Sequence, residues 1–417
     1  MRAGAGLSTV PDGRAAADEA SLAASQGLGG ASASLAVVVA SPHHAPRARE
    51  VLDAVHETAR PEALIGCVAE AVVGGPREVE DEPAVSVWLA SFPAPVRTFH
   101  MTFVRTGSGG VLAGWRFEDD PAPAPPVHLM IVDPFTFPAD LLLEHLNRSV
   151  PGALVVGGLA SGASHPGETV LFRDREVLHE GAVGARLPDG VRVRTLVSQG
   201  CRPIGRSYVV TRARDNLLLE LGGRPALERL QETVGSLTVP DRELVSGGLH
   251  LGRVIDEYKA EHGMGDFLVR AVVGADPRTG AVAVGDLLEV GQTVQFHVRD
   301  AATADEELRS LLQREASALP GRPAAALLFT CNGRGSRMFG VPDHDARLVS
   351  QYLAGAPLAG FFCAGELGPI GGRNFLHGFT ASVAVFVDDE APEGRPVEGS
   401  EGAGRTPRAA GPRPPTS

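Results

Sequence analysis

The chain has 417 residues, a hydrophobic content of 43 % and a formal net charge of −12 at pH 7. This length allows two or three domains with a sizeable core, and an acidic chain without a basic cluster is not expected to bind nucleic acid. No apolar stretch approaches the ~18 residues that span a bilayer, and no secretory signal is recognisable, so we expect a cytoplasmic protein without membrane insertion.

Four cysteines are spread along the chain and form no C-x-x-C pair: Cys67, Cys201, Cys331 and Cys363. In a chain of this length, such spacing is not that of a disulfide framework, and it matches no zinc pattern. We therefore expect reduced thiols, no metal and no cofactor.

The two ends of the chain differ in composition from the rest. Residues 1–33 are rich in Ala, Gly and Ser, which predicts a flexible lead with a short helix near 14–24. Residues 388–417 contain almost no large apolar side chains and are predicted to be disordered, because they cannot bury enough surface to offset their ordering entropy.

Three segments between these ends share one plan. Each has a short apolar strand, an amphipathic helix and a second strand rich in small residues, and a third strand follows. This order is typical of strand–helix–strand units. The expected strands and helices are 35–40, 47–59, 63–67 and 85–90; then 127–132, 139–148 and 153–158; then 324–329, 343–353, 357–362 and 379–386.

The remaining segments, 169–215 and 267–299, have the alternation and turn residues of β-hairpins, and Asp276–Gly280 is a hairpin turn. The predicted fold is therefore mixed α/β (α+β), with repeated strand–helix–strand units, mixed sheets and β-hairpin insertions. A break in the pattern near residue 238 predicts two domains, 34–237 and 238–387.

The densest group of unusual residues follows the strand at 324–329. Loops at the carboxyl ends of strands are common ligand sites in open α/β sheets, and glycines let backbone N–H groups converge on an anion. Arginines there can bind a carboxylate or a phosphate, although in a tight turn they can equally be structural. The candidate ligand-binding residues are Cys331, Asn332, Gly333, Arg334, Gly335 and Arg337.

Two enzymatic readings of Cys331 remain open. Cys331 and Arg337 have the C-x5-R spacing of tyrosine-phosphatase loops, but the flanking Thr330 and Met338 depart from that pattern. Cys331 could also be a nucleophile activated by His344 or His377. A free cysteine is more often a small buried apolar side chain, so we expect no catalysis and keep a hydrolase or phosphatase-like enzyme as the alternative.

Further candidates lie in three other polar segments. Glu366 follows a buried strand among glycines, where a carboxylate can bind an amine or simply cap a turn. The remaining candidate ligand-binding residues are Asn374 and His377, just before the last strand, Arg202, between two strands, and Asp133, at the end of the 127–132 strand.

Several motifs of the chain, and the order in which they occur, resemble those of the FIST family, in which an N-terminal and a C-terminal FIST domain occur together. The residues that carry the resemblance are Asp133–Phe135, Val155–Gly162, Ser198–Gly205, Leu327–Gly340, His344–Asp345, Gly365–Gly372 and Asn374–Ser382. The likeness spans residues 35–387. It implies an intracellular sensory module that binds small ligands such as amino acids, without an established catalytic residue.

Taken together, these features predict a non-enzymatic sensor that relays ligand binding through a signalling partner, with a protein-interaction scaffold as a further alternative. Our hypothesis is that Arg334 or Arg337 binds the carboxylate of a zwitterion and that Glu366 binds its amine.

Overall fold

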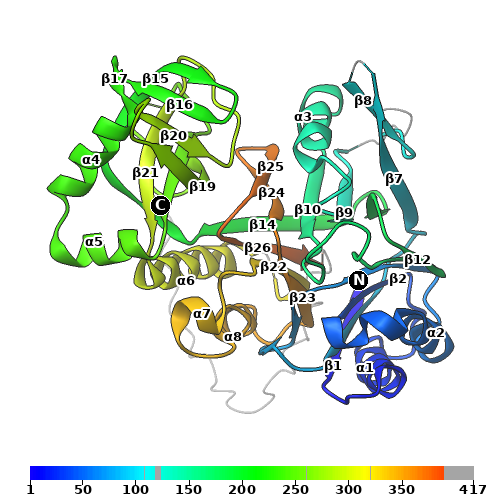
Figure 1. Cartoon of the computed structure of the whole chain (residues 1–417). Coiled ribbons are helices and arrows are strands. Elements are labelled where there is room, and N and C mark those ends of the chain that lie inside the picture. Colours follow the sequence, from blue (N-terminus) through cyan, green and yellow to red (C-terminus); the bar gives the residue numbers. More distant parts are fainter. Residues whose placement is uncertain (108, 118–123, 260, 320, 389–417) are drawn as a thin grey trace, which may run out of the picture.

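The computed structural model describes residues 1–107, 109–117, 124–259, 261–319 and 321–388, which form three similar units and one β-barrel (Figure 1). The predicted mixed α/β fold with repeated strand–helix–strand units and β-hairpins is confirmed. The tail predicted to be disordered, 388–417, lies outside the described residues except for Asp388.

Each unit contributes its elements in the same order: an outer strand, a first strand, a helix, a second strand, a hairpin and a closing strand. The first unit consists of β1 (Arg2–Ser8), α1 (Gly13–Gly27), β2 (Leu35–Ala40), the 3-10 helix η1 (Pro42–Arg47), α2 (Ala48–Thr58), β3 (Ala63–Val68), β4 (Ala71–Gly74), β5 (Arg77–Glu80) and β6 (Val85–Ser91). The second consists of β7 (Arg97–Thr106), β8 (Gly109–Ala113), β9 (Val127–Val132), α3 (Ala139–Ser149), β10 (Leu154–Leu159), β11 (Leu171–Arg173), β12 (Glu176–Leu178) and β13 (Ala182–Arg186). The third consists of β14 (Arg192–Gln199), α6 (Ala301–Ala318), β22 (Pro323–Cys331), α7 (Ser336–Phe339), α8 (His344–Tyr352), β23 (Leu358–Cys363), β24 (Glu366–Ile370), β25 (Arg373–His377) and β26 (Thr380–Val387).

The central strands of the three units have the same topology. The first and second strands are parallel neighbours, and the closing strand pairs antiparallel with the first, giving the orders β6-β2-β3, β13-β9-β10 and β26-β22-β23. A glycine occupies the same place in each second strand: Gly66, Gly157 and Gly360. A Cβ atom there would lie only 2.0, 1.8 and 1.8 Å from a carbonyl oxygen of the first strand, so only glycine fits.

The hairpins connect the units in a closed cycle. The hairpin β4–β5 of the first unit pairs with β23 of the third, the hairpin β24–β25 of the third pairs with β10 of the second, and the hairpin β11–β12 of the second pairs with β3 of the first. Each sheet is thus completed by residues of a neighbouring unit.

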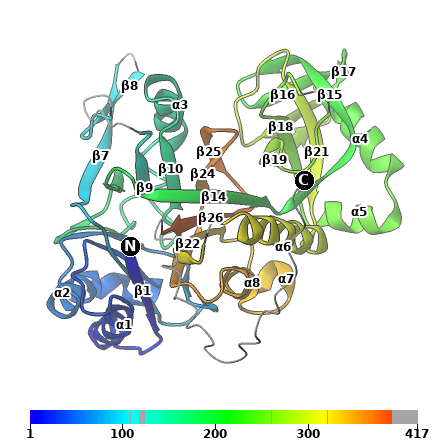
Figure 2. The same cartoon turned by 180° about the vertical axis from the view of Figure 1, so that it is seen from behind.

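The three sheets enclose a shared apolar core. Their inner faces contribute residues such as Val39, Ile131 and Phe329, all almost fully buried. Helices cover the outer faces: α1 and α2 on the first sheet, α3 on the second, and α6 and α8 on the third (Figures 1 and 2). Burial of apolar surface on both faces explains why the central strands are nearly continuous runs of apolar residues.

The fourth sheet is a β-barrel inserted into the third unit between β14 and α6. Its strand order is β15-β21-β18-β19-β20-β16-β17, and β15 also pairs with β16, which closes the barrel. The barrel comprises β15 (Cys201–Arg214), β16 (Leu217–Leu221), β17 (Arg224–Pro225), α4 (Ala226–Ser236), α5 (Val239–Ser246), β18 (Leu249–Val254), β19 (Phe267–Asp276), β20 (Ala281–Val284) and β21 (Thr293–Arg299). The boundary predicted near residue 238 falls inside this barrel, between α4 and α5.

The N-terminal residues are ordered, contrary to the flexible lead predicted for 1–33. Strand β1 pairs with β6 over its whole length, and α1 packs against both strands. The glycines that suggested flexibility have a packing role: a Cβ atom at Gly4 or Gly6 would lie 1.9–2.0 Å from a carbonyl oxygen of α1. They allow the helix to approach the strand closely.

Candidate functional site

The arginine of the predicted loop is buried in an ion pair. Arg334 follows β22, and its Nε and Nη2 atoms donate to Oδ2 and Oδ1 of Asp345 in α8 over 2.6 and 2.9 Å. Neither side chain is exposed to solvent. Burial opposes ionisation of Asp345, but the charge of Arg334 and the hydrogen bonds around the carboxylate hold its pKa well below the usual range.

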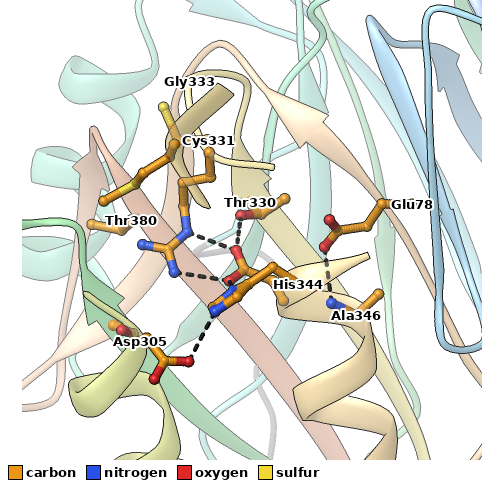
Figure 3. A network of polar contacts seen from close by, with 12 residues as sticks. Glu78, Asp305, Thr330, Cys331, Gly333, His344, Ala346 and Thr380 are labelled. Carbon is orange, nitrogen blue, oxygen red and sulfur yellow. Dashed lines mark hydrogen bonds and ion pairs between the residues drawn. The ribbon is translucent and has the colours of Figure 1, made fainter. Parts of the chain in front are cut away.

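Further side chains extend this ion pair. The hydroxyl of Thr330 donates to Asp345 over 2.7 Å, and His344 bridges Asp345 and Asp305 through its two ring nitrogens, each 2.9 Å from a carboxylate oxygen (Figure 3). The ring of Phe339 stacks on His344. Asp345 therefore has three side-chain partners, and it orients Arg334 rigidly.

The acidic hairpin β4–β5 of the first unit holds the loop that follows β22. The Glu78 carboxylate accepts the N–H of Ala346 at the start of α8, and Glu80 accepts both the N–H and the hydroxyl of Ser336 at the start of α7. Burial, together with the nearby Asp345, raises the pKa of Glu78 well above its ordinary value of 4.5.

Glu366 is buried at the first position of β24. Its Oε2 atom accepts the N–H and the hydroxyl of Thr380 over 3.0 and 2.7 Å, but its Oε1 atom is buried without a hydrogen-bond partner. Burial raises the pKa of Glu366 to about 8 despite these hydrogen bonds and the charge of Arg334. The Nη1 atom of Arg334 is likewise buried without a partner. The two predicted binding groups thus each retain one unused polar atom.

Cys331 lies between these groups but lacks the features of a nucleophile. Burial and the proximity of Glu366 raise the pKa of its thiol to about 11. Arg337, the arginine of the C-x5-R spacing, is 58 % exposed and pairs with Glu70 at the surface. His344 is held by two aspartates, and the only hydrogen bond described for His377 joins it to the carbonyl of Gly368. This geometry does not favour either enzymatic reading.

The glycines and Asn332 shape the loop. Gly335 has a φ of 64° and is the N-cap of α7, and the carbonyl of Gly333 accepts a hydrogen bond from the barrel residue Arg299. Asn332 donates to Glu70 over 3.1 Å. Together with Arg337 and Phe362 it lines a small surface hollow beside the hairpin β4–β5.

Asp133 and Asn374 lie in the second sheet and have complete sets of structural partners. Asp133 accepts hydrogen bonds from the hydroxyls of Thr169 and Thr136 and from the N–H of Phe135. The side-chain oxygen of Asn374 accepts the N–H of Val155 in β10, and its side-chain nitrogen donates to the carbonyl of Ala153, just before this strand. The contacts of Asn374 fix the hairpin β24–β25 to the second unit, and those of Asp133 lie within that unit.

His377 and Arg202 lie at the junction of the third unit with the barrel. Burial lowers the pKa of His377 to about 4, so it is neutral at pH 7. Arg202 pairs with Asp241 and Asp300 over 2.6 and 2.9 Å, which links β15 to α5 and to the N-cap of α6. Arg202 thus holds the barrel junction together, whereas the ring of His377 bonds within its own hairpin, to the carbonyl of Gly368.

Arg299 was not among the predicted site residues, because it stands at the end of an ordinary strand pattern. It is the last residue of β21, and its Nη2 atom donates to the Gly333 carbonyl over 2.6 Å. Its Nε atom is buried without a partner, as are single polar atoms of three neighbours in this junction, Gln199, His250 and His297. No local pattern could reveal this gathering, because it requires the barrel to dock on the third unit.

Two general features of the described residues bear on the class of protein. None of their helices combines the length and apolar character that crossing a bilayer requires. Nor do any three of their His, Cys, Asp or Glu side chains lie together as a metal ion would need.

Comparison with known proteins gives the family. Residues 34–224 match the model of the FIST N domain, and residues 226–369 match that of the FIST C domain. The chain is 55 % identical over 388 residues to uncharacterized protein Rv0628c of Mycobacterium tuberculosis, an alignment that covers 93 % of this chain and all of the relative. It is also 55 % identical over 389 residues to uncharacterized protein Mb0898c of Mycobacterium bovis, with the same coverage. The chain therefore belongs to the FIST family.

Proposed function

We propose that this protein is an intracellular sensory module that binds a small polar ligand, with amino acids as the first candidates, and relays binding through a protein partner. Association of FIST domains with sensing in signal transduction supports the general role. The observation that supports this site is the pair of unused buried atoms, Nη1 of Arg334 and Oε1 of Glu366.

Such atoms are costly in a folded protein. A buried donor or acceptor without a partner destabilises the fold by about 1–3 kcal/mol, so most are satisfied and each exception needs a reason. The Arg334 guanidinium offers a donor, and the Glu366 carboxyl group offers an acceptor once it is ionised, which the positive charge of a bound ammonium group favours. A zwitterion with a carboxylate and an amine would satisfy both.

The burial of the site suits a sensor better than an open receptor. Arg334 and Glu366 have no exposed surface, so a ligand can reach them only after neighbouring segments move. A movement that accompanies binding is what a sensory module needs, because a partner can respond only to a ligand-dependent change of the protein.

Catalysis by Cys331 is the weaker alternative. A thiol with a pKa of about 11 is almost entirely protonated at pH 7, and the thiolate is the form that attacks a substrate. No residue is bonded to the sulfur as a general base in the described part of the site.

Thermal-shift screening with the twenty amino acids, followed by calorimetric titration of any that stabilise the protein, tests the proposal. We expect saturable binding that Glu366→Gln weakens at least tenfold, since this change removes the carboxyl acceptor but keeps the shape. The matched control is Arg337→Ala, which should bind normally. Binding by no amino acid, or equal binding by Glu366→Gln, would contradict the proposal.

Arg334→Ala is a poor test of binding, because it would leave the Asp345 carboxylate buried without its counter-charge. Loss of binding in that variant would follow from unfolding as readily as from a missing contact.

A further inference from the structure

Arg299 joins the barrel to three residues near the candidate site, Gly333, Met338 and Phe379, which we call the cover of the site. Its Nη2 atom donates to the Gly333 carbonyl over 2.6 Å and approaches the Met338 sulfur over 3.5 Å, and its Cζ atom lies 5.5 Å from the centre of the Phe379 ring. These three residues are only partly buried, whereas Cys331, Arg334 and Glu366 of the candidate site are buried. One guanidinium thus fastens the cover of the site.

The contacts of Arg299 differ from those of the other arginines near the site. Arg334 is neutralised by a bidentate carboxylate, Arg202 by two carboxylates and Arg337 by Glu70. All contacts described for Arg299 are with uncharged groups: a carbonyl, a thioether and an aromatic ring. Its Nε–H has no partner at all.

We propose that Arg299 recognises the anionic group of the ligand together with Arg334, and that binding of this group to Arg299 releases the cover of the site. The inference rests on the proposed function only in placing a ligand at this junction. It assigns the chemistry of recognition, a planar guanidinium with a carboxylate, to a barrel residue.

The energetics favour such an exchange of partners. Hydrogen bonds between a guanidinium and a carboxylate are roughly twice as strong as those with neutral acceptors, and the fork of donors can bind both oxygens. A carboxylate that reaches Arg299 therefore competes well with the Gly333 carbonyl and the Met338 sulfur.

The backbone of the cover is poised to move. Phe379 has a φ of 68°, a strained conformation that a bulky side chain rarely adopts. Its ring is held between His250, with ring centroids 4.3 Å apart, and Arg299. The ring also packs against the apolar cluster of Cys201, Val254, Phe267 and Val269, so departure of Arg299 removes one of several contacts that maintain this conformation.

Access to Cys331 reports on the cover without a known ligand. The full-length protein is treated with iodoacetamide at constant pH, and alkylation of Cys331 and of the core residue Cys67 is followed by peptide mass spectrometry. We expect Arg299→Gln to accelerate the alkylation of Cys331 at least tenfold and to leave Cys67 unchanged. The control is Arg253→Gln, a barrel arginine that pairs with Asp286 away from the site and should behave as wild type.

The anion is tested in the same assay with acetate and with its neutral counterpart acetamide, at matched ionic strength. Acetate should accelerate the alkylation of Cys331 in the wild type and have no effect on Arg299→Gln, whereas acetamide should have no effect on either protein. The assignment would be overturned if acetate did not accelerate the alkylation of Cys331 in the wild type, or if it did so equally in the two proteins. An equal rise in the alkylation of Cys67 would also overturn it, because it would indicate general unfolding.

These outcomes separate the two proposals. If acetate acts through Arg299 but no amino acid binds, the recognition of an anion stands and the proposed amino-acid ligand fails. If amino acids bind equally well to Arg299→Gln and the wild type, the ligand stands and the role of Arg299 fails.

Discussion

The second and third units place polar residues at equivalent positions and use them differently. Asp133 directly follows the first strand of the second unit, and Cys331 ends the first strand of the third. The two positions are equivalent, because Asp133 comes three residues after Met130, which pairs with Gly157, and Cys331 comes three residues after Leu328, which pairs with Gly360. Around Asp133 both carboxylate oxygens are bonded to neighbouring hydroxyl groups. Around Cys331, in contrast, Arg334 and Glu366 each keep an unused atom.

This contrast separates a structural polar cluster from a functional candidate within one fold. Composition does not distinguish the two places, because both offer a carboxylate near the end of a buried strand. Completeness of hydrogen bonding does, since a closed set of partners stabilises the fold and an open set leaves capacity for a ligand.

The largest effect should come from the ion pair of the third unit. Asp345→Ala would leave Arg334 charged and buried without its partner, which costs about 3–5 kcal/mol. We expect a marked fall in the denaturant midpoint, measured by circular dichroism in urea. A midpoint within experimental error of the wild type would mean that the ion pair contributes nothing to the fold.

Substitutions of Asp133 and Glu366 test the contrast directly. Asp133→Ala should lower the free energy of unfolding by about 1–3 kcal/mol, because it leaves the buried Thr169 hydroxyl without its acceptor, and it should not change ligand affinity. Glu366→Gln should have the opposite effects. Stability should change little, since the amide oxygen can still accept hydrogen bonds from Thr380, whereas ligand affinity should be lost. Calorimetric titration measures the ligand affinity of each variant, and urea denaturation measures its free energy of unfolding. If both variants lost affinity and stability to the same extent, the distinction between a structural and a functional cluster would be wrong.

The pH dependence of stability should reflect the open site. Burial raises the pKa of Glu78 and Glu366 to about 8 and that of Glu307 to about 7, from an ordinary value of 4.5. At a pH between the ordinary pKa of 4.5 in the unfolded chain and the raised pKa in the folded protein, the folded protein binds more protons than the unfolded chain. The free energy of unfolding therefore falls as pH rises. Above pH 6.5 the buried histidines, with pKa values lowered to about 4, no longer oppose this trend.

We therefore expect the Tm to fall by at least roughly 2 °C between pH 6.5 and 8.5, measured by differential scanning calorimetry. The fall should be smaller in Glu366→Gln, which cannot lose a proton in this window. A Tm that rises with pH over the same range would show that these carboxyl groups are not protonated in the folded protein.

The smallest effect should follow from Arg337→Ala. This side chain is 58 % exposed, and an exposed ion pair contributes about 0–1 kcal/mol. Both the Tm and the affinity for any ligand should stay close to wild type. A large loss of affinity would instead move the binding site to the surface hollow beside Glu70.

Local patterns predicted the repeated units well, because a buried strand, an amphipathic helix and a second buried strand each leave a signature within a few residues. The strand 35–40 and the helix near 48–58 form as expected. The exchanged hairpins could not be predicted, since pairing between Val73 and Gly360 joins residues that are far apart in sequence. Strand β1 was missed because its small residues have low strand propensity and are used for close packing on α1.

The candidate site was predicted in part. The segments around Cys331 and Glu366 lie close together, because Cys331 pairs with Cys363, but the sequence alone left this open. The partner of Arg334 was not predicted, although Asp345 is only eleven residues away, because a turn and the short helix α7 separate them. Whether the predicted residues bind a ligand stays a prediction.

The cyclic exchange of hairpins also constrains the order in which the protein can mature on the ribosome. The hairpin at residues 71–80 is synthesised early, but its partner strand at 358–363 emerges almost 300 residues later. The second sheet likewise waits for residues 366–377. Nascent chains must therefore carry unpaired strand edges through most of translation, which exposes them to aggregation and makes them natural clients of chaperones.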